Sequence, residues 1–338
     1  MLRRLHDLIL ENQEALAQLL AAEQGKPIFE ARGEVGFSAN YVMWFAEEAR
    51  RVYGETVPSP WADRRMMVTK EPVGVVGAIT PWNFPSSMLA RKIAPALAAG
   101  CTIVCKPAEA TPYSGLAWGK LCEEAGIPAG VVNILTGDPV AIGEVLTSHP
   151  MVRKITFTGS TRVGKILMSQ SVSTVKKISM EMGGNAPFIV FDDADVDSAV
   201  EGAIASKFRN SGQTCVCTNR IYVQSGIHDK FVEKFTAATA AMKVGQSNED
   251  NVLQGPLIND AAVSKTKEFV KDAVEKGGVI TTGGNAHDLG HGFFEPTVIT
   301  NATQDMMFSK EEIFGPVLPI LAYNSEYDID AIINEIEA

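Results

Sequence analysis

Long apolar runs are missing from this sequence of 338 residues. No stretch approaches the roughly 20 consecutive apolar residues that a membrane-spanning helix needs. Near the N-terminus, apolar residues follow Arg3 and Arg4, but His6, Asp7 and Glu11 interrupt them and no small-residue cleavage site follows. A signal peptide carries an uninterrupted apolar block and such a site. The sequence therefore predicts a cytoplasmic chain with no membrane partner.

Cysteine is also scarce. The five cysteines are Cys101, Cys105, Cys122, Cys215 and Cys217. An odd, sparse set in a long chain is typical of reduced thiols and not of a disulfide framework. Zinc is disfavoured because Cys215 and Cys217 are too close together for C-x-x-C, and no histidine lies near them. We expect no bound metal.

The chain lacks an excess of positive charge. Lys and Arg number 30 against 40 Asp and Glu, which gives a net charge of −10. Such a surface disfavours nucleic acid and anionic lipid as main partners, although a local basic pocket for an anionic substrate stays compatible. The hydrophobic fraction of 46% and charged fraction of 21% are ordinary for a globular protein. The length accommodates two domains.

Apolar periodicity predicts the fold class. Residues 2–23 show helical spacing, and a second helical stretch runs through Tyr41, Phe45 and Ala49. Short apolar runs then alternate with helical patterns; the runs are 75–79, 102–105, 131–135 and 155–157, and the helices are 87–99, 114–125 and 140–148. A second series follows Gly183–Gly184. This alternation is typical of βαβ units and parallel sheets. It predicts an α/β protein with domains 1–183 and 184–338.

Three segments contain candidate catalytic groups. Cys215 follows a glycine and small polar residues, which suits a nucleophile that needs exposure and room for a carbonyl. Glu181 precedes Gly183–Gly184, whose flexibility would let the carboxylate swing and accept a proton. Asn83 follows a strand and carries an amide that suits a developing oxyanion. The alternatives are a buried structural cysteine, a surface carboxylate before a turn and a proline-stiffened loop.

Three further segments are weaker signals. Lys106 and Glu109 follow a strand and could bracket ribose hydroxyls, with Glu109 repelling a 2′-phosphate. A solvated charge pair is the alternative. The segment 157–164 joins a strand to a helix and leaves amides for phosphate, but it lacks the full G-x-G-x-x-G pattern. Residues 311–316 have no strong independent meaning.

Together and in this order, the segments closely resemble the aldehyde dehydrogenase superfamily. The motifs are P-W-N-F-P, K-P-A-E-x-T-P, F-T-G-S-T-x-x-G, E-M-G-G-N, G-Q-T-C and E-E-I-F-G-P, at 81–85, 106–112, 157–164, 181–185, 212–215 and 311–316. The resemblance implies a Rossmann-like cofactor domain, a catalytic α/β domain and part of an oligomerisation element near 57–74. It implies that Cys215 attacks the aldehyde, that Asn83 holds the oxyanion, and that Glu181 activates Cys215 or the hydrolytic water.

The resemblance also implies a dinucleotide cofactor, NAD or NADP, with NAD favoured because of Glu109. The cofactor-binding positions that it implies are Trp82, Asn83, Lys106, Ala108, Glu109, Gly159, Ser160, Glu312 and Phe314. Lys106 and Glu109 correspond to adenosine-ribose contacts, and Gly159 and Ser160 to the pyrophosphate turn. Glu312 corresponds to the nicotinamide ribose.

Within the superfamily the chain looks most like succinate-semialdehyde dehydrogenases. Relatives of that subgroup carry arginines at the positions of Arg91 and Arg209 to hold the substrate's distant carboxylate. Both could instead be surface residues on helices. We therefore expect oxidation of succinate semialdehyde to succinate. Alternatives are glutarate semialdehyde, a 2-oxoglutarate semialdehyde or a hydroxyaldehyde, and an inactive truncated remnant that binds cofactor.

The sequence departs from the family pattern at both ends. The family's N-terminal extension, its later P-F-G-G-x-K-x-S-G motif and its final oligomerisation strand are absent. We expect a fragment or truncated gene product, in which the homo-oligomeric assembly of the family is weakened. Cys217 lies two residues from Cys215, a spacing that allows a reversible disulfide in some relatives. A small packed cysteine is an equally compatible role for Cys217.

Overall fold

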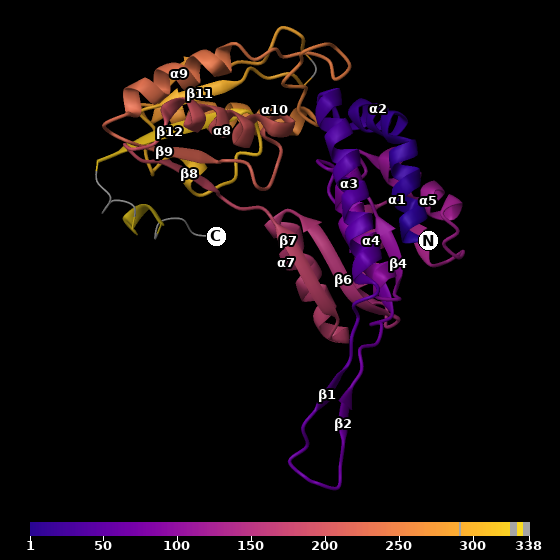
Figure 1. Cartoon of the computed structure of the whole chain (residues 1–338). Helices are drawn as coiled ribbons and strands as arrows, with labels where there is room; N and C mark the ends of the chain where they lie inside the picture. Colours follow the sequence, from indigo (N-terminus) through magenta and orange to yellow (C-terminus); the bar gives the residue numbers. More distant parts are fainter. Residues whose placement is uncertain (291, 325–329, 334–338) are drawn as a thin grey trace. The chain divides into compact units, whose positions relative to one another are not determined.

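The computed structural model describes residues 1–290, 292–324 and 330–333, and it divides into two compact units. Unit 1 comprises Met1–Glu23 and Ala31–Met182, and unit 2 comprises Gln24–Glu30 and Gly183–Ala338. Figure 1 shows the elements of both. The segment Gln24–Glu30, which we had placed in the first domain, groups with unit 2. Its backbone is bound there, because the Ile28 amide donates to the Ser247 carbonyl at 2.8 Å.

A parallel sheet forms the centre of unit 1. Its strand order is β5-β4-β3-β6-β7, and all four neighbouring pairs are parallel. The strands are β3 (Val75–Ile79), β4 (Thr102–Lys106), β5 (Val132–Ile134), β6 (Val152–Gly159) and β7 (Lys177–Met182). The predicted parallel α/β sheet is confirmed. Strand β7 was not among the predicted strands, because five of its six residues are exposed and it has no continuous apolar run.

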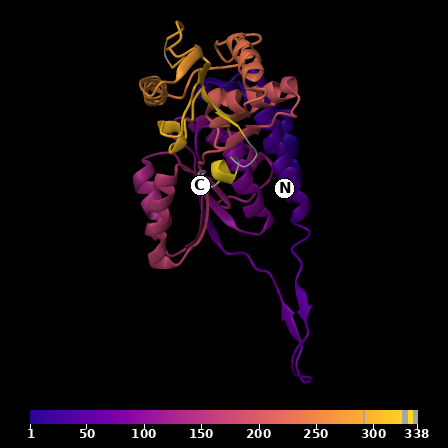
Figure 2. The same cartoon turned by 90° about the vertical axis from the view of Figure 1, so that its left-hand side faces the viewer.

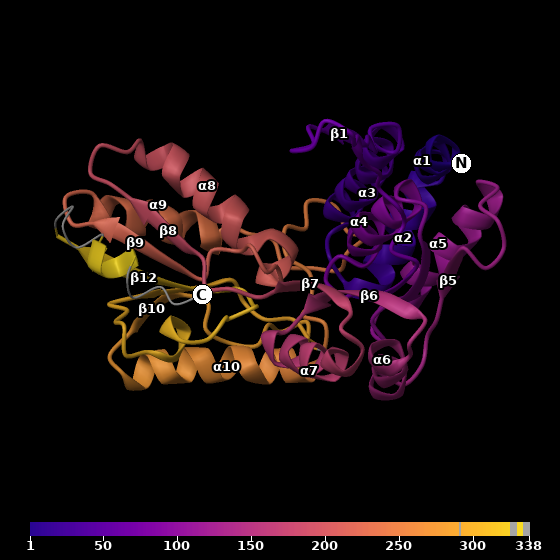
Figure 3. The ribbon, with the colours of Figure 1, turned by 90° about the horizontal axis from the view of Figure 1, so that it is seen from below.

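Helices cover both faces of this sheet. Figure 3 shows α6 (Pro139–Ser148) and α7 (Thr161–Ser171) on one side, and α3 (Ile28–Glu48) and α4 (Pro85–Ala98) on the other. The remaining helices of this part of the chain are α1 (Leu2–Glu11), α2 (Gln13–Gln24) and α5 (Pro112–Glu124). The single helix predicted over 2–23 is wrong. It breaks at Asn12, whose side-chain amide donates to the Leu8 carbonyl at 2.8 Å and thereby ends α1.

A two-stranded hairpin of β1 (Glu55–Val57) and β2 (Met66–Val68) belongs to unit 1. Figures 1 and 2 both show it extending away from the unit 1 sheet. All six strand residues are exposed, Met67 among them, and so is Trp61 in the connecting loop. The hairpin overlaps the region 57–74 of the predicted oligomerisation element, and that role stays a prediction.

Unit 2 contains a second five-stranded sheet. Its order is β10-β11-β12-β9-β8, and only the edge strand β10 is antiparallel to its neighbour. The strands are β8 (Pro187–Val190), β9 (Arg220–Gln224), β10 (Val279–Thr282), β11 (Thr297–Thr300) and β12 (Val317–Tyr323). Figure 3 shows α8 (Val196–Phe208) and α9 (His228–Ala240) on one face and α10 (Asp260–Glu275) on the other.

Each face of the unit 2 sheet has its own apolar core. Phe269 of α10 belongs to one cluster, and the helices α8 and α9 supply the other. In the second cluster, Phe235 stacks on Phe231 and Phe208, with ring centroids 5.6 and 6.2 Å apart. In the part of the chain that the structure describes, no helix combines the length and apolarity that a membrane span requires.

The stacked phenylalanines generate a stability prediction. Phe235 is fully buried, so Phe235→Ala should leave a cavity and lower the free energy of unfolding by about 3–5 kcal/mol. Phe29→Ala is the matched control, because this ring is 53% exposed. Urea unfolding of both variants measures the difference. Equal losses for the two would contradict the proposed core role of Phe235.

Candidate functional site

Four of the predicted motifs lie at the carboxyl edge of the unit 1 sheet. In the parallel register, Ile79 of β3 lies opposite Lys106 of β4 and Phe157 of β6, and Thr158 lies opposite Glu181 of β7. The strands therefore end together. The loops that contain Asn83, Lys106–Glu109 and Gly159–Ser160 all start from this edge, beside Glu181. Ligands of open α/β sheets bind at such edges.

Lys106 and Glu109 form an ion pair directly after β4. The Lys106 side chain is buried, and burial lowers its pKa, whereas the Glu109 carboxylate is about half exposed. Ala108 between them is buried. The pair is thus neither fully solvated nor fully enclosed. It presents a carboxylate and an ammonium at the rim of the sheet, which suits contacts to ribose hydroxyls.

The turn from β6 into α7 suits a phosphate. Ser160 is the N-cap of α7 and accepts a hydrogen bond from the Val163 amide at 3.4 Å. The first turn of α7 contains no acidic residue that would repel an anion. A Cβ on Gly159 would collide with the Phe157 ring. The backbone at Gly159 therefore requires the absence of a side chain, and these residues fit a dinucleotide pyrophosphate.

The loop between β3 and α4 buries its central residue. Asn83 is only 3% exposed, whereas Trp82 is partly buried. Phe84 is buried, as expected of a core plug, and Pro85 begins α4. Asn83 therefore lies in the interior of the loop that leaves the carboxyl edge of the sheet.

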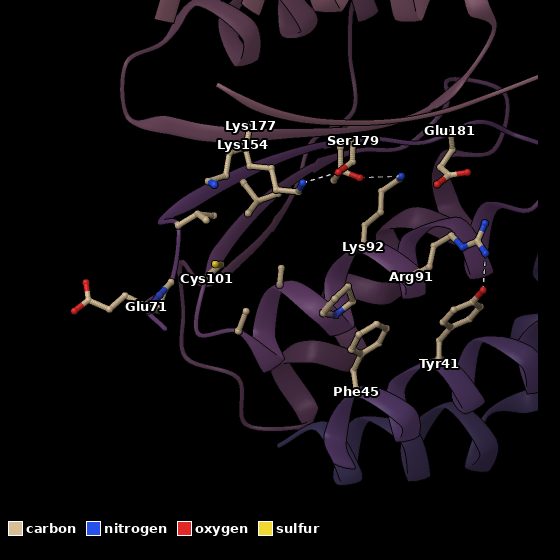
Figure 4. A pocket seen from close by; sticks show the side chains of 17 residues that line it. Tyr41, Phe45, Glu71, Arg91, Lys92, Cys101, Lys154, Lys177, Ser179 and Glu181 are labelled. Atoms are coloured by element: carbon tan, nitrogen blue, oxygen red, sulfur yellow. Dashed lines mark hydrogen bonds between the residues drawn. The ribbon is translucent and has the colours of Figure 1, made fainter. Parts of the chain in front are cut away.

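A cavity of about 570 Å³ lies in unit 1 between α3, α4 and the face of strands β6 and β7. Two predicted site residues, Arg91 and Glu181, line it together (Figure 4). Lys92 lines it as well and donates to the Thr156 and Thr158 hydroxyls at 3.1 and 2.8 Å. Burial and, to a smaller extent, the charge of Arg91 lower the pKa of Lys92 to about 8, whereas Glu181 opposes the shift.

The sequence reasoning missed Tyr41, another residue of this cavity. Its hydroxyl accepts a hydrogen bond from the Arg91 guanidinium at 2.5 Å. The only sequence signal for Tyr41 was its helical spacing with Phe45, which indicates a packed face and no particular chemistry. Its pairing with Arg91, 50 positions away, arises from the packing of α3 beside α4.

The loop that carries Cys215 in unit 2 has an unusual backbone. Asn210, Ser211 and Gly212 are all left-handed, with φ of 53°, 56° and 76°. For non-glycine residues this conformation is uncommon and persists only where surrounding contacts impose it. Ser211 donates to the Gly255 carbonyl at 2.9 Å, and a Cβ on Gly212 would overlap the Gly315 carbonyl. The loop is therefore packed closely against two other segments of unit 2.

Hydrogen bonds hold this loop at both ends. The Asn210 amide donates to the Glu30 carboxylate at 2.8 Å. The buried Gln213 side chain donates to the Asn210 carbonyl at 3.1 Å and accepts from the Ile258 amide at 2.9 Å. The Cys217 amide then bonds the Thr214 carbonyl at 2.9 Å, which closes a turn. Cys215 lies within this turn and is partly exposed.

Cys217 and Arg209 flank this turn and differ in exposure. The Cys217 thiol is buried, lies 3.8 Å from the Arg209 carbonyl oxygen and has a pKa that burial raises. A raised pKa disfavours the thiolate that reacts with oxidants. Its predicted role as a redox partner of Cys215 stays a prediction. The Arg209 residue is exposed after the end of α8.

Asn219 joins three segments at the amino ends of β8, β9 and β12. Its amide nitrogen donates to Asn185 at 2.6 Å and to the Phe308 carbonyl at 2.9 Å, and its oxygen accepts from the Ile313 amide at 2.8 Å. The Gly183–Asn185, Cys215 and Glu312–Phe314 segments therefore lie together within unit 2. Asn219 was not predicted, because a single asparagine after the catalytic motif has no distinctive spacing.

Glu312 lies directly against the backbone of Gly183, where a Cβ would collide with the carboxylate. The Lys265 ammonium donates to the Glu312 carbonyl at 2.6 Å. Burial raises the pKa of Glu312 to about 7, and Lys265, the Gly184 amide and Lys207 oppose that shift. Two residues later, Phe314 has a left-handed φ of 54°. Together they form a strained, half-buried wall with one titratable carboxyl group.

The arrangement can be compared with known proteins. A model of the aldehyde dehydrogenase family matches residues 1–338. The chain belongs to this family. It is 58% identical over 337 residues to 3-sulfolactaldehyde dehydrogenase of Pseudomonas putida, covering 100% of this chain and 69% of that protein. It is 56% identical over 334 residues to the mitochondrial succinate-semialdehyde dehydrogenase of Arabidopsis thaliana, covering 99% and 63%.

Solved structures of the family agree with the fold. The crystal structure of succinate-semialdehyde dehydrogenase from Burkholderia pseudomallei matches with a TM-score of 0.97 at 56% identity, over 98% of this chain and 69% of that one. The predicted aldehyde dehydrogenase fold is confirmed, and by family the chain is an oxidoreductase. It spans 63% to 69% of the length of these three relatives.

The raised pKa of Glu312 generates a pH prediction. The folded protein holds the Glu312 proton up to about pH 7, whereas an ordinary glutamate releases it near 4.5. The stability from this proton is therefore complete below about pH 4.5 and is lost as the pH rises through 7. Glu312→Gln removes this titration. The melting temperature of the variant minus that of the unmodified protein should therefore increase as the pH is raised from 5 to 8.

Glu311→Gln is the control, because the neighbouring Glu311 residue is exposed. Its melting temperature relative to the unmodified protein should not follow that trend. A Glu312→Gln difference that is constant across the pH range would contradict the burial of an ionisable carboxyl group at this position.

Proposed function

We propose that the chain oxidises a small aldehyde bearing a distant anionic group to the carboxylic acid, with succinate semialdehyde as the favoured substrate. The observation that carries this proposal is the cavity of unit 1, where the Arg91 guanidinium and the Glu181 carboxylate lie together. One group matches a substrate carboxylate, and the other can accept a proton. A cavity with both suits an acid aldehyde better than a neutral one.

In the proposed reaction, Cys215 is the nucleophile. Its thiolate forms a bond to the carbonyl carbon, and the oxygen becomes an oxyanion that accepts hydrogen bonds from the Asn83 amide and the Cys215 backbone N–H. A bound nicotinamide dinucleotide supplies the acceptor for the hydride that leaves this carbon. Water then attacks the Cys215 thioester and gives its proton to Glu181. The acid departs, and the Cys215 thiolate is restored.

The proposed cofactor contacts are those that the family resemblance implies. In unit 1 the Lys106–Glu109 pair suits the adenosine ribose, and Gly159 and Ser160 suit the pyrophosphate. Ala108 and Trp82 would line the cofactor path, and Asn83 lies in the same loop as Trp82. In unit 2, Glu312 would accept from the nicotinamide ribose, and Phe314 would bound the ring. The exposed Glu109 carboxylate favours NAD over NADP, because it repels a 2′-phosphate.

The names of the relatives support an anionic aldehyde. One is named for 3-sulfolactaldehyde and two for succinate semialdehyde. A sulfonate and a carboxylate both present oxygens that a planar guanidinium can bind through two hydrogen bonds. Arg91, with Arg209 as the second proposed cation, serves either. Glutarate semialdehyde also fits, because the cavity volume exceeds that of a four-carbon acid.

NADH formation by the purified chain tests the proposal. The aldehydes are succinate semialdehyde, glutarate semialdehyde, 3-sulfolactaldehyde and butanal. We expect the three acidic aldehydes to be oxidised with higher kcat/KM than butanal, with succinate semialdehyde highest. Cofactor binding without oxidation of any of them would overturn the proposed activity and favour a cofactor-binding protein.

The nucleophile is tested by replacing Cys215 and Cys217 with alanine, one at a time. Cys215→Ala should reduce aldehyde oxidation by roughly 10³-fold or more, because it removes the proposed nucleophile. Its affinity for NADH should stay close to that of the unmodified protein in a fluorescence titration. Cys217→Ala should retain activity. An active Cys215→Ala with an inactive Cys217→Ala would reverse the assignment.

The carboxylate contact is tested by removal of each arginine. Arg91→Ala or Arg209→Ala should lower kcat/KM for succinate semialdehyde by roughly tenfold to a hundredfold, which corresponds to the loss of a charge-assisted hydrogen bond. Butanal oxidation should change little, since butanal has no carboxylate. Arg50→Ala, at an exposed arginine, is the control. Equal losses for both aldehydes would show that the arginines support the fold.

A further inference from the structure

Tyr41 lies in the cavity beside the proposed carboxylate site, and no motif of the sequence assigns it a role. It belongs to α3, whereas Arg91 belongs to α4. Two contacts join the residues (Figure 4). The Arg91 Nη2 donates to the Tyr41 hydroxyl at 2.5 Å, and the guanidinium carbon lies 5.2 Å from the centre of the Tyr41 ring.

The Tyr41 ring is itself held in place. Phe37, one helical turn earlier, packs against it edge-to-face with centroids 4.9 Å apart and an interplanar angle of 77°. The guanidinium has a further contact from Nη1 to the Met88 sulfur at 3.7 Å. Arg91 is therefore oriented by Tyr41 on one side and by its own helix on the other, with Phe37 supporting the tyrosine.

The orientation of the Arg91 guanidinium matters because a carboxylate, that of Glu181, lines the same cavity. A guanidinium that turned to Glu181 would form a bidentate pair with the proposed base. A base in such a pair is less able to accept a proton, because the cation stabilises its ionised form. The Tyr41 hydroxyl offers Arg91 a neutral partner, which leaves the carboxylate of Glu181 available.

The Tyr41 hydroxyl can also act as a hydrogen-bond donor. A tyrosine hydroxyl that accepts one hydrogen bond can still donate another, and a guanidinium has five N–H donors, of which the contacts to Tyr41 and Met88 use two. An anionic group beside this pair could accept from the phenol and from the guanidinium together. Two donors from neighbouring helices fit the two oxygens of one carboxylate.

We infer that Tyr41 is a specificity-determining residue that orients Arg91 and donates a hydrogen bond to the distant carboxylate or sulfonate of the substrate. This inference rests on the proposed oxidation of an acidic aldehyde. In this arrangement the Tyr41 hydroxyl is a neutral hydrogen-bond donor to the substrate anion, beside the charged Arg91. Because Tyr41 is also the partner of Arg91, Arg91 and Glu181 can line one cavity without forming an ion pair.

Tyr41→Phe tests the inference, since it removes only the hydroxyl and keeps the ring that packs on Phe37. We expect kcat/KM for succinate semialdehyde to fall roughly tenfold to a hundredfold, mostly through KM, and kcat/KM for butanal to change less than about twofold. Tyr113→Phe, at an exposed tyrosine, is the control and should match the unmodified protein. Equal losses for both aldehydes would overturn the inference.

The double variant Tyr41→Phe/Arg91→Ala separates the inference from the proposed function. If both residues bind one carboxylate, removal of the Tyr41 hydroxyl should matter less once Arg91 is absent. If Arg91→Ala alone discriminates the two aldehydes and Tyr41→Phe does not, only the role of Tyr41 is wrong. If neither variant discriminates, the carboxylate site itself is wrong.

Calorimetric titration with succinate gives the same comparison without turnover. The unmodified chain should bind succinate, and Tyr41→Phe and Arg91→Ala should each weaken that binding, whereas Tyr113→Phe should not. Binding that is unchanged in Tyr41→Phe, or succinate that fails to bind the unmodified chain, would overturn the inference.

Discussion

The buried side-chain amide of Asn219 is the constraint on which the arrangement of the unit 2 segments before β8, β9 and β12 depends. A single side chain binds Asn185, Phe308 and Ile313, and thereby joins segments more than 90 positions apart. The left-handed backbone from Asn210 to Gly212 packs closely against two further segments, at Gly255 and Gly315. Cys215 is partly exposed in a loop that is otherwise firmly fixed. Exposure of the thiol and rigidity of its support are the two properties that a positioned nucleophile needs.

In unit 1, cationic and anionic side chains line one cavity, and the two cations Arg91 and Lys92 hydrogen-bond to hydroxyl groups. Lys92 is buried and bound to the Thr156 and Thr158 hydroxyls, so its ammonium is held against the sheet. Arg91 is held by Tyr41, and Glu181 remains in the same cavity. Hydroxyl groups thus take the place of carboxylates as partners of the two cations. This arrangement supports the proposed roles of Arg91 as a partner of an anionic ligand and of Glu181 as the base.

Much of the architecture was predictable from local pattern. Strand β3 has the bounds of the apolar run that predicts it, and Pro85, Pro112 and Pro139 stand where helices begin. Strand β7 could not be recognised, because its side chains are mostly exposed and its pairing with β6 comes from the sheet and not from its own composition. The break at Asn12 was missed for a related reason. One side-chain bond to the Leu8 carbonyl interrupts an apolar spacing that by itself continues.

The sequence by itself determined the family, the α/β fold and the identities of the candidate groups, because glycines, prolines and reactive side chains at fixed spacing are specific to that fold. Only the tertiary structure placed Arg91 and Glu181 in one cavity and brought Tyr41 to Arg91. It also brought Glu30 to the Asn210 backbone amide and Ile313 to Asn219. These contacts join residues that are between 50 and 180 positions apart. No local periodicity encodes such pairs, because they depend on how helices and strands pack after they have formed.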